Sequence, residues 1–427
     1  MNFCYFLAAS MLWNLTFIFD IDSNLPLDRC FHRIKIRFYI VRSNCKKLMS
    51  DQHNSEAAQK RLSSELKRRQ FLKGVGFIGA GAGASFLADH ILNSNLEAEA
   101  TIPTNQIMPS LAQANPSSTT KGEIPRRPLG KTGVEVSAIG LGGSNLGQAS
   151  SREEAIRITH EAVDNGITFM DNAWEYNKHV SEEWMGQALQ GRRDKVFLMS
   201  KVCTHGRDAR VAMQQLEESL RRLKTDYLDL WQIHEVVYYN DPELIFRTNG
   251  VIEALDKAKK QGKVKFVGFT GHKDPAIHLK MLSYNYAFDT VQLPLNCFDA
   301  SFRSFEKQVL PELNKRGIGA IGMKSLSGNG DAIKKGILTP QEALLYSMSL
   351  PVATVVSGID SLAVLRQNLA IARNFQPMDT ASMQALRDRT RKYATDGRFE
   401  LFKTSIKFEA DEGRMQHGFP PQSQMET

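Results

Sequence analysis

The fold is predicted outward from one stretch, Ile167-Thr168-Phe169-Met170-Asp171-Asn172-Ala173-Trp174-Glu175-Tyr176. An apolar strand runs into Asp171, and Tyr176 stands five residues beyond that acid. Three other apolar runs carry a polar group at or near their ends, namely Lys201, His234 and Gln292. Polar groups that close successive buried strands are typical of a parallel barrel, which presents its chemistry at one rim.

Apolar strands alternate with amphipathic helices from Gly122 onward, at intervals of roughly 30 residues, the length of one strand–helix unit. The predicted strands are 136–142, 168–172, 196–201, 228–234, 264–270, 290–295, 318–324 and 354–358. The predicted helices are 152–164, 182–190, 207–223, 249–261, 275–284, 302–316, 340–349 and 362–375. Eight such pairs favour an α/β fold, the (β/α)8 TIM barrel, and a doubly wound open sheet is the alternative.

Two segments outside this repeat have predicted places of their own. Residues 128–134 are expected to form a hairpin that plugs the lower end of the barrel. The tail after Arg373 carries aromatic residues and is expected to lie over the active rim.

Charge and cysteine content argue against several classes of partner. The net charge is +8, but residues 1–100 hold 13 Lys/Arg and 9 Asp/Glu, so half of the excess precedes the repeat. The rest is spread thinly, and we therefore expect no nucleic-acid partner. Of the 5 cysteines, only Cys203 and Cys297 follow residue 45, and neither belongs to a Cys-x-x-Cys pair. No metal site is expected.

The front of the chain resembles a targeting segment rather than part of the fold. Arg68 and Arg69 precede Phe71-Leu72-Lys73 and a Gly/Ala-rich apolar run, with a small-x-small cleavage site after Ala100. This pattern resembles a twin-arginine-type export signal, which implies the export machinery as a partner and a periplasmic location. Cleavage would leave no permanent membrane span, although an uncleaved anchor is the alternative.

The predicted division of the chain follows from that signal. Residues 1–48 are a non-fold extension, because Met49 is the more natural start. Residues 49–100 are the signal, 101–121 a Pro/Ser/Thr/Asn-rich linker, 122–376 the barrel, and 377–427 a C-terminal helix and tail.

The four ionisable residues compose a site for proton transfer. A tyrosine is a poor acid at neutral pH, and a lysine ammonium beside Tyr176 is expected to lower the pKa of its phenol. Asp171 would keep Lys201 charged and oriented, and His234 could hydrogen-bond the substrate oxygen or relay the proton. Such a site suits protonation of a carbonyl oxygen while hydride arrives at carbon. Since no side chain supplies hydride, a nicotinamide cofactor is expected.

This constellation resembles the aldo-keto reductase family, over residues 129–375. The catalytic tetrad of that family falls on Asp171, Tyr176, Lys201 and His234. The Asp-x-Ala-x-x-Tyr run is intact, but Asn177 replaces the glycine that usually follows the tyrosine. Taken singly, each of these residues also suits a structural role, and only their joint placement favours chemistry.

The same resemblance implies a set of residues that bind NADP or NAD. These are Gly142, Gly143, Ser144, Thr270, Gly271, Gln292, Met323, Lys324, Leu326, Gly358 and Asn368. Three departures weaken it. Gly271 stands for the family's asparagine, Met323 for its stacking aromatic, and Gly358 and Val364 for the cations that grip a 2′-phosphate. Arg366 is a possible substitute, so the choice between NADH and NADPH stays open.

The leading hypothesis is an exported NAD(P)H-dependent oxidoreductase that interconverts aldehydes or ketones and alcohols, with Tyr176 as general acid/base. An exported dinucleotide-binding sensor or partner protein with little turnover is the alternative. A barrel hydrolase that uses a metal is disfavoured, because it leaves the tyrosine–lysine pair unexplained.

Overall fold

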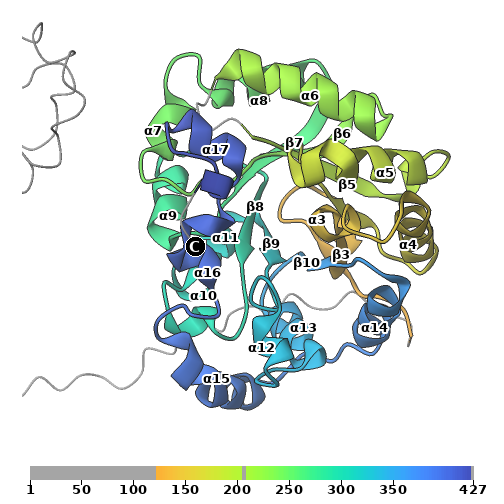
Figure 1. The fold of residues 1–427 in the computed structure, drawn as a ribbon, viewed down its shortest axis with the longest axis vertical. Helices are drawn as coiled ribbons and strands as arrows, with labels where there is room; N and C mark the ends of the chain where they lie inside the picture. The colour runs from red at the N-terminus through yellow and green to blue at the C-terminus, as the bar shows by residue number, and fades with distance from the viewer. Residues whose placement is uncertain (1–121, 204–207, 425–427) are drawn as a thin grey trace, which may run out of the picture. The chain divides into compact units, whose positions relative to one another are not determined.

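Eight parallel strands close into a barrel with the order β10-β3-β4-β5-β6-β7-β8-β9 (Figure 1). The computed structural model describes residues 122–203 and 208–424, so the predicted extension, signal and linker lie outside the described residues. The barrel strands are β3 (Ile139–Gly142), β4 (Phe169–Asp171), β5 (Phe197–Val202), β6 (Leu228–Ile233), β7 (Val264–Thr270), β8 (Thr290–Pro294), β9 (Gly319–Met323) and β10 (Thr354–Gly358). The pairing of β10 with β3 closes the sheet, which confirms the TIM barrel and rules out the open doubly wound sheet.

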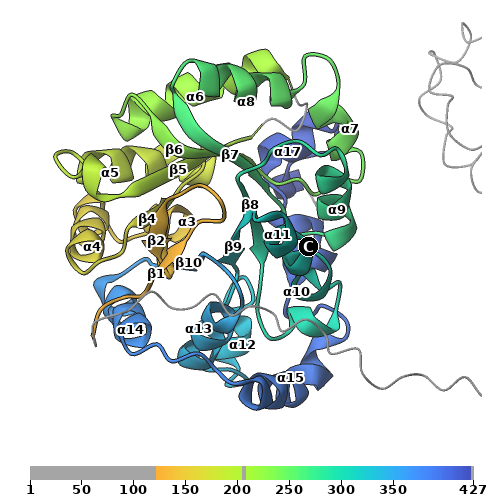
Figure 2. The same cartoon turned by 180° about the vertical axis from the view of Figure 1, so that it is seen from behind.

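Helices surround the barrel as the repeat predicts (Figures 1 and 2). Those of the outer ring are α4 (Arg152–Asp164), α5 (Val180–Ala188), α6 (Ala209–Leu223), α8 (Val251–Lys260), α9 (Pro275–Ser283), α11 (Leu310–Arg316), α13 (Pro340–Ser349) and α14 (Leu362–Arg373). Shorter or later ones are α3 (Gly143–Leu146), α7 (Asp241–Phe246), α10 (Phe305–Gln308), α12 (Asp331–Lys334), α15 (Thr380–Ala394), α16 (Leu401–Thr404) and α17 (Asp411–Gln416). In the described part of the chain, none of the helices has both the length and the apolar character that a membrane span needs.

Two predicted elements are each broken in two. The expected strand 136–142 divides at Ala138, because β2 (Glu135–Ser137) pairs with β1 (Arg126–Pro128) outside the barrel and only β3 joins it. The expected helix 302–316 becomes α10 and α11, which meet at Val309. Pro311 lies in the first turn of α11, where a residue without a backbone N–H is tolerated but cannot continue an earlier helix.

The hairpin of β1 and β2 covers the end of the barrel where the strands begin, and Figure 2 labels both strands. Leu129 is fully buried and packs with inward-facing residues such as Phe169 and Ile321. Gly130 has a φ of +56°, and a Cβ there would lie 2.7 Å from the carbonyl oxygen of Gly317. The hairpin therefore approaches the start of β9 so closely that only glycine fits, as expected of a plug.

The core has two layers, which leaves one end of the barrel for chemistry. Inside the strands, Phe169 stacks on Phe197 and Phe197 on Phe266, with centroids 5.5 and 6.2 Å apart. Outside them, a larger apolar cluster joins the strands to the helices. Since apolar side chains and the hairpin fill the lower part of the barrel, polar groups are confined to the rim where the strands end.

Candidate active site

The predicted polar residues lie together at the rim formed by the carboxyl ends of the strands. Asp171 is the last residue of β4, Lys201 lies one residue before the end of β5, and His234 follows β6 directly. Gln292 in β8 reaches across, and its Nε2 donates to Asp171 Oδ1 at 3.2 Å. All four side chains are buried, so a single site draws on four separate strands.

Lys201 connects the acid to the phenol. Its Nζ lies 2.7 Å from Asp171 Oδ1 and donates to the carbonyl oxygen of Asn172 at 2.9 Å. The same ammonium donates to the hydroxyl oxygen of Tyr176 at 3.0 Å. The lysine is only 1% exposed, so its positive charge is directed at these three oxygens rather than at water.

The loop that carries Tyr176 is shaped by three consecutive residues with positive φ. Asn177, Lys178 and His179 have φ of 53°, 53° and 77°. Asparagine enters this left-handed region more readily than most residues, and its side-chain Nδ2 also donates to Ser144 O at 3.2 Å. This explains how Asn177 can stand where the family usually has glycine.

His234 completes the group of four, and it has a further partner. Its ring meets the ring of Tyr176 edge-on, with centroids 5.5 Å apart at 78°. Its Nδ1 is hydrogen-bonded to Glu175 Oε1. The histidine therefore lies between the phenol and a carboxylate of the same loop.

Burial changes the proton affinity of the phenol. Burial is the largest cause of the raised pKa of Tyr176, which lies well above its ordinary value. The negative charges of Asp171, Glu175 and Glu235 raise this pKa further. This direction is opposite to the lowered pKa expected from the lysine alone. The reason is that loss of water and three acids disfavour the phenolate more than one ammonium favours it. The resting phenol is held protonated.

Buried acceptors without partners suit a nicotinamide next to this group. Gln292 Oε1 is buried and has no hydrogen-bond partner among the described residues, while Gln292 Nε2 donates a hydrogen bond to Asp171 Oδ1. Thr270, the last residue of β7, lies beside it in the sheet register. At Gly271 a Cβ would come within 2.8 Å of the His278 ring, so a larger residue has no room there. An amide oxygen that is buried and unpaired is costly, and the carboxamide of a nicotinamide could satisfy it.

The loop after β9 offers donors for phosphate. The hydroxyls of Ser325 and Ser327 are buried without described partners, and Leu326 between them packs against the core. Lys324 is half-buried, and its Nζ lies 5.2 Å from the centroid of the Phe402 ring. Burial lowers the pKa of Lys324. Two free hydroxyls beside an amine fit a pyrophosphate group, and Met323 ends β9 just before them.

The remaining predicted cofactor residues lie along β3 and β10, which are neighbours. Gly142 pairs with Gly358 in the sheet register, and Gly143 begins α3 with Ser144. Asn368 is buried, and its Nδ2 donates to Ser357 Oγ at 3.0 Å.

Arg366, the possible substitute for the missing cations, is engaged elsewhere. Its Nε lies 2.7 Å from Glu161 Oε1 and its Nη2 lies 3.0 Å from Glu161 Oε2. Val364 is only partly buried and packs against the core. Gly358 and Val364, which stand where the family carries cations, therefore bring no positive charge to the adenine end of the site, and the charge of Arg366 is paired with Glu161.

The tail, residues 396–424, lies against the loops of the active rim, and Figures 1 and 2 show α17 beside α7, where His417 Nε2 lies 3.0 Å from Asp241 Oδ1. The carbonyl oxygen of Phe402 accepts from His272 Nδ1 at 3.1 Å. The Glu409 carboxylate accepts hydrogen bonds from Lys273 Nζ at 2.8 Å and from the Tyr238 hydroxyl at 2.8 Å. These contacts join the tail to the loops that follow β6 and β7, where it was expected.

A second fully buried lysine attaches the tail to the loop after β8. Lys403 Nζ lies 2.6 Å from Asp299 Oδ1 and 3.0 Å from Glu400, and it donates to Phe302 O at 2.8 Å. Burial raises the pKa of Asp299, and it raises that of Glu400 to about 7. Sequence reasoning missed this cluster, because no local pattern links residue 299 with residue 403.

Glu175 was also missed, although a signal for it was present. An acid directly before the predicted catalytic tyrosine lies in the same rim loop, so its side chain was bound to be close to the site. Its contact with His234 could only come from the folded structure, because the two residues are 59 positions apart.

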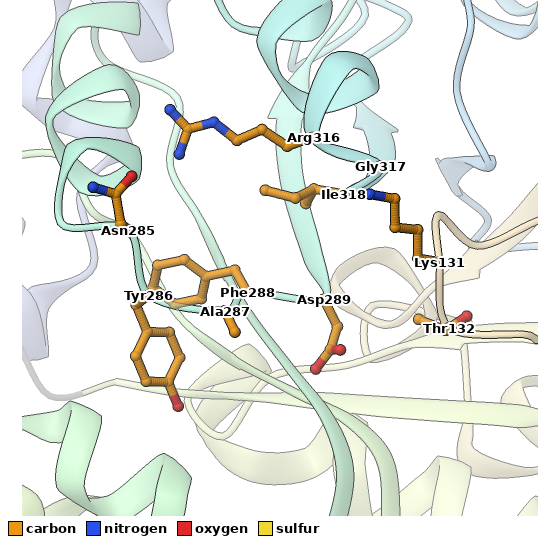
Figure 3. A pocket seen from close by; sticks show the side chains of 10 residues that line it. All are labelled: Lys131, Thr132, Asn285, Tyr286, Ala287, Phe288, Asp289, Arg316, Gly317 and Ile318. Carbon is orange, nitrogen blue, oxygen red and sulfur yellow. The ribbon is translucent and has the colours of Figure 1, made fainter.

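A cavity of about 300 Å³ lies at the opposite end of the barrel (Figure 3). The hairpin residues Lys131 and Thr132 and the segments just before β8 and β9 line it. These segments precede their strands, so this cavity is remote from the tetrad. Within residues 122–203 and 208–424, no three His, Cys, Asp or Glu side chains are grouped to hold a metal ion.

Known proteins resemble this chain in sequence. The model of the aldo/keto reductase family matches residues 138–334. L-galactose dehydrogenase of Arabidopsis thaliana is 31% identical over 235 residues, which cover 51% of this chain and 68% of that protein. Methylglyoxal reductase YeaE of Escherichia coli is 32% identical over 186 residues, which cover 43% and 58%.

A solved structure resembles the fold. The holo form of aldo-keto reductase AKR11C1 from Bacillus halodurans superposes with a TM-score of 0.53 at 22% identity. The match covers 62% of this chain and 96% of that one. At this level of identity the likeness concerns the fold of the barrel.

Proposed function

This chain belongs to the aldo/keto reductase family of NAD(P)-dependent oxidoreductases, and on that premise we propose that it reduces aldehydes or ketones to alcohols with Tyr176 as the proton donor. One observation carries the proposal. Lys201 Nζ stands between Asp171 Oδ1 and the Tyr176 hydroxyl, at 2.7 and 3.0 Å. A structural ion pair would need no phenol at hydrogen-bond distance, whereas proton transfer does.

The residues of the site divide the work of reduction. A bound nicotinamide supplies hydride for the carbonyl carbon. Tyr176 gives its hydroxyl proton to the carbonyl oxygen as negative charge develops there, and Lys201 stabilises the phenolate that remains. Asp171 holds the ammonium in place, and His234 hydrogen-bonds the same substrate oxygen.

The protonation state of the phenol favours this direction. Since burial raises the pKa of Tyr176, its hydroxyl carries the proton throughout the neutral range and is ready to act as an acid. Oxidation of an alcohol needs the phenolate as a base, so it should require more alkaline conditions than reduction.

We expect the cofactor to lie along the rim from β7 to β10 and back to β3. Gln292 and Thr270 would receive the carboxamide, Lys324 and the two serines after it the pyrophosphate, and Asn368 the adenine end. Arg366, the possible partner of a 2′-phosphate, is paired with Glu161. We therefore expect the enzyme to use NADH at least as well as NADPH.

The test is the Tyr176→Phe variant, which lacks the hydroxyl group that donates the proton but keeps the aromatic ring. Reduction of methylglyoxal and of a panel of other aldehydes and ketones should fall by roughly 10²- to 10⁴-fold, the usual contribution of a general acid. Binding of NADH, followed by fluorescence, should persist. Tyr286→Phe is the matched control, because that hydroxyl donates to Asp256 instead of to the site. Full activity of Tyr176→Phe would remove the mechanism.

We further propose that residues 49–100 direct export of the folded enzyme to the periplasm. The support is the order of Arg68 and Arg69, the apolar run and the small residues before position 101. A fusion of residues 49–121 to a reporter that matures only when folded should reach the periplasm of a bacterial host. Replacement of both arginines by lysine should retain the reporter in the cytoplasm, and unchanged export would rule out this route.

A further inference from the structure

Glu175 and His234 form a pair that the reduction described above does not yet use. His234 Nδ1 is hydrogen-bonded to Glu175 Oε1, and the two side chains are 9% and 6% exposed. Glu175 Oε2 is buried without a hydrogen-bond partner in the described part of the chain. The imidazole is therefore the one side chain that compensates this carboxylate through a described hydrogen bond.

The charges around the pair make that compensation more important. The titratable groups of the neighbouring segments are Asp171, Tyr176, His179, Lys201, Glu235 and Glu412. Three of these six groups, Asp171, Glu235 and Glu412, are acids. Lys201 is already paired with Asp171, and His272 Nε2 lies 3.7 Å from Glu235 Oε1, so neither is free to pair with Glu175. A buried carboxylate in such surroundings is costly unless a cation pairs with it.

The chemistry of imidazole then links the pair to the substrate. The two ring nitrogens of an imidazole are separate hydrogen-bonding positions. Nδ1 of His234 is hydrogen-bonded to Glu175, and Nε2 has no hydrogen-bond partner among residues 122–203 and 208–424. A carboxylate that holds one side of a histidine in this way fixes the orientation of the ring and the nitrogen that faces the reaction.

We propose that Glu175 is a positioning residue, which holds His234 through the hydrogen bond at Nδ1 and so keeps Nε2 of the ring directed toward the substrate carbonyl oxygen. This role rests on the proposed reductase activity, since the oxygen in question is the one that Tyr176 protonates. In the absence of Glu175 the ring has no carboxylate partner, and the direction of Nε2 is no longer fixed.

The hydrogen bond at His234 Nδ1 can be measured without turnover. The full-length protein with ¹⁵N-labelled histidine should show a hydrogen-bonded Nδ1, whose signal is assigned by its disappearance in His234→Ala. In Glu175→Gln that Nδ1 signal should shift, because a neutral amide replaces the carboxylate. An Nδ1 without a hydrogen bond in the unmodified protein would overturn the proposal, whether or not the variant folds.

Kinetics give the second readout. Glu175→Gln should lower kcat for methylglyoxal by roughly 10- to 100-fold, the usual cost of losing a residue that orients a catalytic group, with little change in KM. In the His234→Ala background the same change should have no further effect, because Glu175 acts through the histidine. An equal loss in both backgrounds would contradict the role.

A control separates this effect from a general change in charge. Glu412→Gln in α17 removes a neighbouring acid that has no described hydrogen bond to His234, and its activity should stay close to that of the unmodified enzyme. The two proposals also fail separately. Full activity of Tyr176→Phe would end the reductase mechanism, while the nitrogen signature of His234 would still decide the role of Glu175.

Discussion

Two lysines, Lys201 and Lys403, are almost completely removed from water, and each is held by a carboxylate and a backbone carbonyl. The difference lies in the third partner. For Lys201 it is the Tyr176 hydroxyl at 3.0 Å, and for Lys403 it is a second carboxylate, Glu400, at 3.0 Å. A phenol can pass a proton to a ligand, whereas a second acid only completes the neutralisation. A buried ion pair therefore does not identify a catalytic site until its other neighbours are known.

The largest effect should follow from breaking the first of these groups. Lys201→Met removes the charge that stabilises the phenolate, and reduction should fall by roughly 10³-fold, as on loss of one strong electrostatic contact in an active site. Asp171 is then left buried and unpaired, which should lower the free energy of unfolding by about 3–5 kcal/mol. Steady-state kinetics and urea unfolding measure the two losses.

A double variant separates these two effects. Asp171→Asn with Lys201→Met removes both charges, so stability should recover while activity does not. Recovery of activity in the double variant would show that Lys201 serves only the fold.

Substitution of Lys403, in the second group, should lower the stability of the fold much more than it lowers turnover. Lys403→Met leaves Asp299 and Glu400 without their cation, and the free energy of unfolding should fall by about 3–5 kcal/mol. Turnover should fall far less than in Lys201→Met, since Lys403 contacts none of the tetrad. A larger loss of kcat in Lys403→Met than in Lys201→Met would reverse the comparison.

The last prediction concerns pH. Burial raises the pKa of Glu400 in the folded protein to about 7, from 4.5, so the proton on this group stabilises the fold at low pH. That contribution is complete below about pH 4.5 and is lost as the pH rises through 7. The urea midpoint of the unmodified protein should decline over this interval relative to that of Glu400→Gln. Parallel curves for the two proteins would show that Glu400 does not titrate there.

The sequence predicted the barrel well because its signals are local. Each strand is a short apolar run, and the edges of β7, β10, α4 and α13 agree with the expected limits of 264–270, 354–358, 152–164 and 340–349. The tetrad could be predicted for the same reason, since strand ends in a parallel barrel converge on one rim. The break between α10 and α11 could have been predicted from Pro311.

What the sequence could not provide were contacts between distant residues that follow no period. The partners of Lys403 depend on how the tail crosses the rim, and the partner of Glu175 depends on the rotation of one loop. The pKa of Tyr176 was expected to move in the wrong direction for a related reason. A neighbouring lysine can be inferred from spacing, but the extent of burial and the number of surrounding acids require coordinates.

The attachment of the tail also bears on the order in which the protein can be completed during synthesis. Asp299 lies 104 positions before the lysine that neutralises it, so a nascent chain that has already made all eight strands still lacks this counter-ion. A truncated product would keep a dehydrated acid beneath an open rim and should be recognised by proteases as unfinished.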